Sequence, residues 1–404
     1  MRTYGQLFRT PEFTPFFLTC SVQVASSTVA GLALATLVYR STGSALLSAL
    51  SMFGPSLAQV LGATLLLSAA DRLPPRAATA AVALAVGVGT AVLAVPGLPL
   101  WAVFAILLAE GLATSVGGGV RYGLLAEILP KDGYLLGRSV LNMSVGTMQI
   151  AGYATGGVLL TVLSPRGALL TAAALGVAAA VLAAAGLSPR PPRTAGRPSV
   201  AETWRTNRRL WSSPARRTLY LALWVPNGLV VGCESLFVPY DPGHAGLLFA
   251  CAAFGMLIGD TLAGRFLPRH RRERLGAPLR LLLALPYLVF AWQPSAPLAA
   301  AAATLASIGF ASSLLLQESL IALTPDDIQG QALGLDTSGR LTLQGVAAAL
   351  AGALAQYTSA ATAITLTAAA SLAVTLALAP GLRPERITAA QGLPAVEPAP
   401  GGGR

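Results

Sequence analysis

The chain has 404 residues, of which 54% are hydrophobic and 11% are charged, and its mean hydropathy is +0.66. This composition excludes a soluble globular protein, a collagen and a disordered chain, because apolar runs of roughly 20 residues, enough to cross about 30 Å of hydrocarbon, recur along the whole sequence. The net charge of +11 would favour a nucleic-acid surface in a soluble protein. Here the basic residues follow the predicted loops, so we expect a lipid bilayer as partner and no nucleic acid.

The apolar runs predict an all-α membrane protein with twelve transmembrane helices. The first run follows Glu12 and aromatic residues, which indicates a helix and not a cleavable signal. Only Arg40 and Arg166, of 27 basic residues, fall in connections on the side away from the termini, so the positive-inside rule predicts cytoplasmic termini and a multi-pass protein of the inner or plasma membrane. The helices are expected at residues 12–38, 45–70, 77–95, 99–129, 134–163, 167–187, 218–239, 245–264, 276–292, 298–323, 330–356 and 360–380.

Two distant stretches of the chain look like copies of each other. The first carries Gly62, Ala70, Arg72, Pro75 and Arg76, and the second, at one constant offset, carries Gly255, Ala263, Arg265, Pro268 and Arg269. We therefore predict two pseudo-symmetric six-helix halves, an N-terminal one at 1–187 and a C-terminal one at 218–382. Parallel repeats of this kind build many secondary transporters, with the substrate site at the midplane between the halves.

A change in composition separates the two predicted halves. Residues 188–217 form an Arg/Pro-rich stretch that is expected to be a cytoplasmic linker, because its prolines cannot continue a helix. Its later part, Trp204–Trp211, is expected to lie on the anionic inner leaflet. Residues 383–404 are rich in Pro, Ala and Gly and predict a disordered cytoplasmic tail.

The residues that usually carry metal, redox or enzyme chemistry are poorly placed for it. Cys20, Cys233 and Cys251 lie in apolar spans, which indicates packing and neither a disulfide nor a metal site. His244 and His270 fall in loops, so any proton coupling must rest on carboxylates. No phosphate-binding loop, nucleophile elbow or His-Glu-x-x-His helix is present, so we expect no cofactor, no ATP-driven pump and no enzyme.

A charged turn between the second and third predicted helices gives the first family resemblance. It contains Asp71, Arg72 and Arg76, and a weaker copy contains Asp260, Arg265 and Arg269. The pattern resembles the cytoplasmic loop motif of the major facilitator superfamily, although Leu67 stands at its leading glycine and Pro74 and Pro75 stand at its later glycine and first cation. The resemblance implies a gating role for these residues, in which Arg121 pairs with Asp71 to latch the outward-open state.

The fifth predicted helix gives the second resemblance. Its Gly152, Gly156 and Gly157 resemble the Gly-Pro-x-x-Gly-Gly element of exporters in this superfamily, with Tyr153 in place of the proline. In that family the element shapes the contact between helices 5 and 8 and is linked to antiport. The wider stretch from Gly111 to Gly157 resembles the subgroup that contains macrolide efflux proteins and the enterobactin exporter. A small-residue packing face is the alternative interpretation.

An ionisable side chain in hydrocarbon is costly unless it is paired or faces water, so carboxyls inside the spans are the leading candidates for function. Glu110 is expected near the midplane of the fourth helix and is the candidate for proton coupling, with a neutral, hydrogen-bonded structural carboxyl as the alternative. In the superfamily, helices 1, 4, 7 and 10 surround the central cavity. This implies that Gln23, Ser27, Asn227 and Glu234 also line it, although Glu234 could instead lie at a solvated mouth. Asp336 and Arg340 lie four residues apart and are expected to neutralise each other.

These features together predict a secondary active transporter. We expect an antiporter driven by the proton gradient that exports small hydrophobic or amphipathic molecules, such as drugs or secondary metabolites, by alternating access and as a monomer. A proton symporter that imports a small solute is the alternative. A membrane sensor that does not transport is a more distant one.

Overall fold

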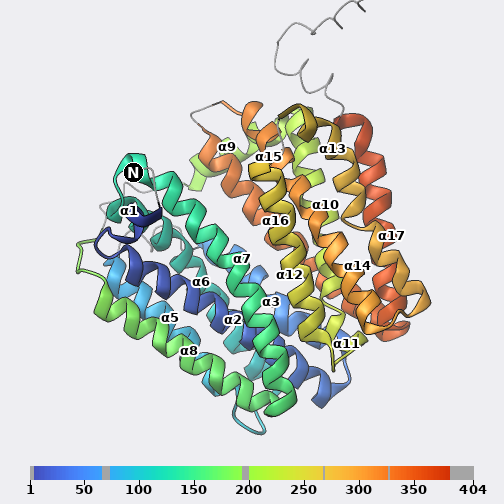
Figure 1. The fold of residues 1–404 in the computed structure, drawn as a ribbon, viewed down its shortest axis with the longest axis horizontal. Coiled ribbons are helices and arrows are strands. Elements are labelled where there is room, and N and C mark those ends of the chain that lie inside the picture. Colours follow the sequence, from blue (N-terminus) through green and yellow to red (C-terminus); the bar gives the residue numbers. More distant parts are fainter. Residues whose placement is uncertain (1–3, 66–72, 193–199, 267–268, 326–327, 383–404) are drawn as a thin grey trace, which may run out of the picture.

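The computed structural model of the chain describes residues 4–65, 73–192, 200–266, 269–325 and 328–382. Every regular element in these ranges is a helix, so the prediction of an all-α protein is confirmed. Figure 1 shows the helices in two groups, the first coloured blue to green and the second yellow-green to red. The first group is called the N-half and contains α1 (Tyr4–Phe8), α2 (Phe13–Thr42), α3 (Ala45–Leu65), α5 (Pro75–Leu93), α6 (Leu100–Ile128), α7 (Lys131–Val162) and α8 (Pro165–Gly186).

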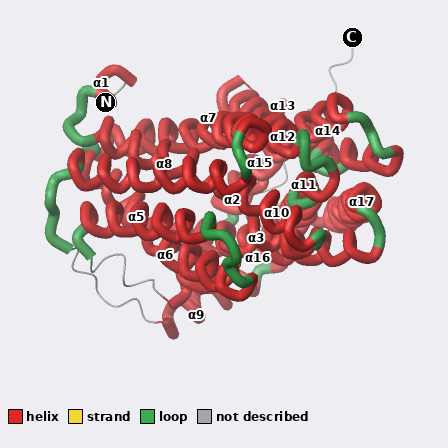
Figure 2. The backbone as a smooth tube through the Cα atoms, turned by 90° about the horizontal axis from the view of Figure 1, so that it is seen from below, coloured by secondary structure: helices red, strands yellow, loops and turns green. Residues whose placement is uncertain are grey.

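The second group is called the C-half and includes the docked helix α9. It contains α9 (Val200–Ser212), α10 (Pro214–Glu234), α11 (Phe237–Tyr240), α12 (Ala245–Thr261), α13 (Arg269–Leu282), α14 (Ala296–Ile308), α15 (Ser312–Ala322), α16 (Gln329–Tyr357) and α17 (Ala360–Leu378). A π turn at Leu262–Phe266 follows α12, and 3-10 segments occupy Leu285–Trp292, Gly309–Ala311 and Ala379–Leu382. Short loops join the helices in Figure 2.

Prolines, glycines and serines set many helix boundaries. Pro75, Pro165 and Pro214 each lie in the first turn of a helix, where a missing N–H costs nothing. Gly43 ends α2 in the left-handed region at φ 65° and donates its N–H to the Tyr39 carbonyl. Ser164 caps α8 by accepting a hydrogen bond from the Gly167 N–H at 3.2 Å. Because Pro214 begins α10, this helix starts four residues before the predicted 218.

Eleven helical stretches of the described residues are long and apolar enough to cross a membrane. They match eleven of the twelve predicted spans. The twelfth prediction, 330–356, corresponds to α16, a single helix of 29 residues that is less apolar because it carries Asp336, Arg340 and several glutamines. The predicted helix at 45–70 is described only to Leu65, and the rest of it lies outside the described residues.

Three predicted spans in the C-half are interrupted, which the sequence analysis did not foresee. The predicted helix at 276–292 is α13 followed by a 3-10 segment that begins at Leu285, next to Pro286. The predicted helix at 298–323 is divided by a 3-10 turn at Gly309. The two breaks meet, because a Cβ atom on Gly309 would lie 2.6 Å from the Leu283 Cα atom. The predicted helix at 218–239 likewise ends at Glu234, and α11 follows it.

The two halves touch mainly through two helix pairs, α3 with α16 and α7 with α12. We call the end of the bundle that carries the α2–α3, α7–α8 and α16–α17 turns the far end, and the end that carries α1 and α9 the terminal end. At the far end the Tyr39 hydroxyl donates to the Pro239 carbonyl at 3.4 Å, and Gln356 donates to the Ser44 hydroxyl. The halves are therefore joined by polar contacts at the far end.

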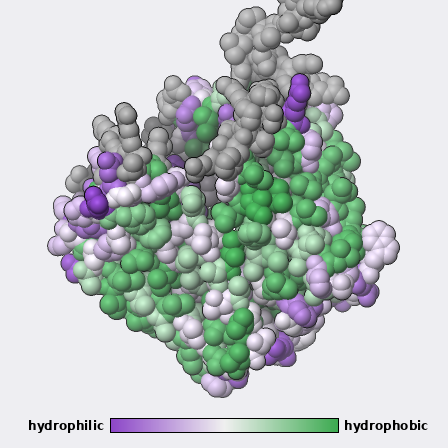
Figure 3. All heavy atoms as spheres, in the orientation of Figure 1, coloured by the Kyte–Doolittle hydropathy of each residue, from purple (hydrophilic) through white to green (hydrophobic). Residues whose placement is uncertain are grey.

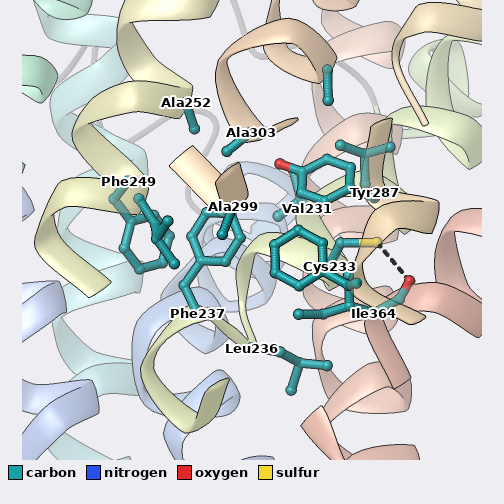
Figure 4. Packing of buried hydrophobic residues seen from close by; sticks show 14 of the residues in the cluster. Val231, Cys233, Leu236, Phe237, Phe249, Ala252, Tyr287, Ala299, Ala303 and Ile364 are labelled. Carbon is teal, nitrogen blue, oxygen red and sulfur yellow. Dashed lines mark hydrogen bonds between the residues drawn. The ribbon is translucent and has the colours of Figure 1, made fainter. Parts of the chain in front are cut away.

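Buried apolar side chains show the same asymmetry. The largest cluster draws Leu32, Ala35 and Ala45 from the N-half and many residues from the C-half, among them Phe237, Phe249, Tyr287 and Ile364 (Figure 4). Two smaller clusters lie toward the terminal end. One, around Phe13, Phe16 and Leu124, belongs entirely to the N-half, and the other, around Leu210 and Tyr220, belongs entirely to the C-half. Apolar packing thus crosses between the halves toward the far end.

The outer surface fits a lipid environment. Hydrophobic residues spread over the flanks of both halves in Figure 3. Large aromatic residues at the far end are highly exposed, with Trp101 at 75%, Trp292 at 79% and Tyr357 at 88%. Trp and Tyr are enriched where a membrane surface meets water, and these exposed residues fit that pattern.

The later part of the predicted linker is a helix docked on the C-half. In α9, Leu210 is fully buried, and the Trp211 ring stacks on Trp224 with ring centroids 5.5 Å apart. Gln331 of α16 donates to Asn207 at 3.1 Å. One face of Trp204–Trp211 thus packs on the C-half, while Trp204 is exposed, and the position of this segment on the inner leaflet stays a prediction. Residues 193–199 of the linker lie outside the described residues.

A hydrogen-bonded cluster closes the terminal end of the N-half. Glu12, just before α2, accepts from the Ser188 hydroxyl at 2.6 Å and from Arg190 Nη1 at 2.7 Å. Arg190 Nε also lies 3.5 Å from a carboxylate oxygen of Glu127 at the end of α6. Burial alone would raise the pKa of Glu12, but the hydrogen bonds from Arg190 and Ser188 outweigh it, so the pKa lies below its ordinary value of 4.5.

Glu12→Gln should lower the melting temperature of the purified protein at pH 7 by about 1 °C, because exposed ion pairs contribute little and the chain is long. A carboxyl whose folded pKa is lowered stabilises the fold above its unfolded pKa and loses that contribution as the pH falls through the folded pKa. The gap between wild type and variant should therefore close below about pH 4.5. A gap that stays constant down to acid pH would contradict this role of Glu12.

Candidate functional site

A cavity of about 350 Å³ lies in the N-half, and Gln344 of α16 contributes to its lining. This volume is within the range of small-molecule sites. Its polar lining comes from Ser27, Thr28, Ser51, Ser56, Gln59, Thr90, Glu110, Thr114, Gln149, Tyr153 and Gln344. Its apolar lining includes Leu34, Met52, Phe53, Val86, Leu93, Leu107 and Leu169. These residues come from the middle and far parts of α2, α3, α5, α6, α7 and α8, so the cavity lies toward the interior of the membrane.

Glu110 is the one ionisable carboxyl of the described cavity lining. It lies on α6 and its side chain turns toward α5, where the Thr90 hydroxyl donates to Oε1 at 3.4 Å. A side chain at Gly89 would overlap the Glu110 carboxylate, so the glycine leaves room for it. Within the described part of the chain, Glu110 forms no ion pair with an arginine, lysine or histidine. It is therefore a carboxyl in the wall of a membrane cavity whose hydrogen-bond partner is a neutral hydroxyl.

The residues predicted on the first and seventh helices are placed differently from one another. Ser27 lines the cavity, whereas Gln23, one turn closer to the terminal end of α2, does not. Asn227 is buried on α10 and accepts a hydrogen bond from Gln344 at 2.9 Å, so it contacts a cavity residue without lining the cavity. Of the residues that the sequence analysis expected in the cavity, Ser27 and Glu110 lie in its lining, together with glutamines that the sequence analysis did not name.

The structure corrects the expected position of Glu234. It was expected in the cavity or at a solvated mouth, but it is only 6% exposed and lies in the apolar core of the C-half. The Tyr287 hydroxyl donates to its Oε1 at 3.4 Å. The neighbouring Val231, Cys233, Phe237 and Tyr287 appear in Figure 4. The prediction failed because α10 is buried on nearly all sides, so two residues on one face need not face an aqueous space.

The glycines of the fifth-helix element lie in tight helix contacts. A Cβ atom on Gly152 would be 2.9 Å from the Thr28 Cβ atom of α2, and Gly156 faces Leu32 of the same helix. Gly157 instead faces α12, where its Cβ would be 3.1 Å from the Gly246 Cα atom. Tyr153, at the position of the missing proline, lines the cavity and stacks on Phe249 of α12 with ring centroids 4.9 Å apart.

The predicted gating residues are only partly described. Asp71 and Arg72 lie outside the described residues, and so do the side chains of Arg265 and Arg269. Arg76 is half-buried at the start of α5, Arg121 is half-buried on α6, and Asp260 lies at the end of α12 before the π turn.

The predicted pair of Asp336 and Arg340 is present on α16. Arg340 Nε lies 3.5 Å from Asp336 Oδ2. Asp336 is fully buried and also accepts from Trp224 Nε1 at 3.1 Å and from Gln317 Nε2 at 2.8 Å. Three donors thus compensate the charge of Asp336, whereas Glu110 accepts a hydrogen bond from one neutral hydroxyl.

The fold and the cavity can be compared with known proteins. Residues 16–240 match the family model of the Major Facilitator Superfamily. The chain belongs to the major facilitator superfamily. It is therefore an integral membrane transporter and not an enzyme. By sequence alone the chain matches no curated protein.

Solved structures of other transporters share the fold at low sequence identity. The nucleoside transporter NupG has a TM-score of 0.74 at 12% identity, covering 92% of this chain and 100% of that one. A POT family transporter in complex with 5-aminolevulinic acid has a TM-score of 0.73 at 12% identity, covering 91% and 95%. A bacterial homolog of the human lysosomal transporter Spinster, in an inward-facing and unoccupied conformation, has a TM-score of 0.69 at 13% identity, covering 94% and 96%.

The contact between Gly157 and Gly246 should be intolerant of side chains. A Cβ atom on Gly246 would lie 2.5 Å from the Gly157 Cα atom, so Gly246→Val must separate α7 from α12. We expect a loss of about 1–3 kcal/mol of stability, measured as a lower melting temperature in detergent. Gly334→Ala on α16, where nothing lies within 4 Å of an added Cβ, is the control and should be neutral or stabilising. Equal melting temperatures for both variants would contradict the assigned packing.

Proposed function

We propose that this member of the major facilitator superfamily is a proton-coupled antiporter that exports small hydrophobic or amphipathic molecules by alternating access. The observation that carries the proposal is Glu110, a carboxyl in the wall of the N-half cavity that has no cationic partner among the described residues. The proton gradient is the energy source in this proposal, and the N-half cavity holds the cargo.

The surroundings of Glu110 suit a group that exchanges a proton. An ionised carboxylate in a dry membrane cavity is costly, whereas the protonated form needs only a neutral hydrogen-bond partner such as Thr90. Water that enters the cavity would instead favour ionisation. A change in access to one side of the membrane can therefore change the proton occupancy of Glu110. Asp336 is less suited to this role because Arg340 and two further donors already stabilise its charge.

The lining of the cavity supports an amphipathic cargo. Apolar side chains such as Met52, Phe53 and Leu107 provide contact surface, and hydroxyl and amide groups provide neutral hydrogen-bond partners. Pockets of this type orient a ligand with a few polar contacts and bind it mainly through apolar area. Phosphates and sugar acids would need cationic partners, and the described lining contains no arginine, lysine or histidine.

The direction of transport rests on two supports. The contacts that join the halves at the far end support an inward-facing state, if the terminal end faces the cytoplasm as the positive-inside rule predicts. Export is supported by the fifth-helix element and by the resemblance to macrolide efflux proteins and the enterobactin exporter. In this chain Gly157 of that element forms a close contact between α7 and α12, where it meets Gly246.

A proton symporter that imports a small solute is the second candidate. It is favoured by the similarity in fold to a nucleoside transporter and to a POT family transporter with bound 5-aminolevulinic acid. The same cavity and the same carboxyl would serve this function, with cargo and proton moving in one direction. A sensor would bind ligand without accumulating it.

Inside-out vesicles with an acidic interior and a pH-sensitive dye separate these functions. Addition of a macrolide, a hydrophobic cation or a siderophore should release protons from wild-type vesicles, and Glu110→Gln should reduce that release to the rate of empty vesicles. Glu318→Gln, which removes an exposed carboxyl of α15, is the control and should behave like wild type. Release that persists in Glu110→Gln would remove Glu110 from the coupling step. Release triggered only by nucleosides or peptides from the opposite face would favour the symporter.

A further inference from the structure

A second and much smaller cavity lies inside the C-half. It is lined by residues of α10, α15 and α17 and of the membrane span that begins with α13. Its volume is about 10 Å³, close to the smallest space that holds one water molecule. Its polar lining consists of Asn227, Arg280, Ser312, Ser313 and Thr375. The lining therefore combines one permanent cation with several groups that can donate hydrogen bonds.

Arg280 is a cation within a membrane span. It lies in the segment Arg274–Trp292, which is long and apolar enough to cross the bilayer, and its side chain runs back along α13 so that Nη1 comes 3.8 Å from the place of a Cβ on Gly276. Across the described residues, no carboxylate forms an ion pair with Arg280. A charge at such a site is costly unless an opposite charge or water compensates it.

Thr375 provides an independent observation. It is 5% exposed, and its hydroxyl is buried without a hydrogen-bond partner among the described residues. A threonine in a helix ordinarily donates to the carbonyl four residues earlier, as Thr365 of the same helix does to Ala361 at 2.9 Å. A buried hydroxyl without a partner costs about 1–3 kcal/mol, so the free hydroxyl at this cavity points to a ligand.

Asn227 adds a further donor. Its side-chain oxygen accepts the hydrogen bond from Gln344 at 2.9 Å, which leaves its amide N–H groups for the cavity. The hydroxyls of Ser312 and Ser313 line the same space and can also donate. One guanidinium and four neutral donor groups around an atom-sized space match an anion better than a cation.

We propose that this cavity binds a monatomic anion, for which chloride is the physiological candidate. The anion would compensate the charge of Arg280 within the membrane and accept a hydrogen bond from Thr375. A water molecule is the competing occupant, because Pro226 has no N–H and leaves the Ala222 carbonyl of the same lining without its helical donor. This proposal concerns the C-half alone and does not depend on the cargo or the direction of transport.

The test uses the full-length protein in nanodiscs of phosphatidylcholine, with gluconate replaced by chloride at constant ionic strength. Chloride should raise the melting temperature with saturation, and bromide should do the same, whereas the large gluconate ion should not. Binding should be seen directly as excess line broadening of the chloride NMR signal. Arg280→Gln should weaken half-saturation at least about tenfold, since it removes a charge-assisted contact.

Matched variants distinguish binding from altered folding. Arg274→Gln removes an exposed arginine from the same helix and should keep the wild-type response. Thr375→Val keeps the shape of the side chain and removes only the hydroxyl, so it should weaken chloride binding without loss of charge. This variant provides the test if Arg280→Gln does not fold. A chloride effect that is absent, unsaturable or unchanged in both cavity variants would overturn the proposal in favour of water. Stabilisation by phosphatidylglycerol nanodiscs, with no response to chloride, would overturn it in favour of a lipid headgroup.

Discussion

Close backbone contact between the two halves at the far end is the constraint on which the rest of the structure depends. Helices in lipid gain little from hydrophobic burial against one another, so small residues that allow close approach determine which helices pair. Gly157 meets Gly246 where α7 crosses α12, and Gly352 of α16 lies so close to α3 that a Cβ would be 2.7 Å from the Leu46 Cα atom. These two contacts hold the far ends of the halves together.

The lipid environment also explains why charged groups inside the spans are few. Each charge inside the spans must be compensated, and the described residues show three ways of doing so. Asp336 is surrounded by donors from α10, α15 and its own helix. Glu110 has only a neutral hydroxyl and faces a cavity, which suits a proton that comes and goes. Arg280 lines an atom-sized space together with neutral donor groups, and there we propose that a small anion provides the compensation.

Hydropathy was enough to predict the membrane helices, because the bilayer requires long apolar helices and the chain supplies them at regular intervals, whereas the two halves were predicted from the internal repeat. The breaks near Leu283 and Gly309 were missed: Pro286 is a signal for the first, whereas the close contact of Gly309 with Leu283 is a tertiary feature that the sequence pattern does not show. Glu110 was found because a carboxyl in an apolar run is conspicuous. Gln59, Gln149 and Gln344 were missed, although a glutamine in hydrocarbon is costly enough to be a signal. Glu234 was misplaced because spacing gives the face of a helix but not what covers that face.

The central claim is that the two halves rock about the N-half cavity, to which α16 of the C-half contributes Gln344, and that they are joined at the far end in the state described here. Electron–electron distance measurements on spin-labelled protein in nanodiscs test it most directly, with the native cysteines replaced. The pair Ser139→Cys with Arg274→Cys reports the distance between the halves at the terminal end. The pair Arg166→Cys with Ser295→Cys reports the distance at the far end. All four positions are exposed. Cargo and a change in pH should populate a second state in which the terminal-end distance shortens while the far-end distance lengthens. Distances that remain fixed in every condition, or that change in the same direction, would contradict the account.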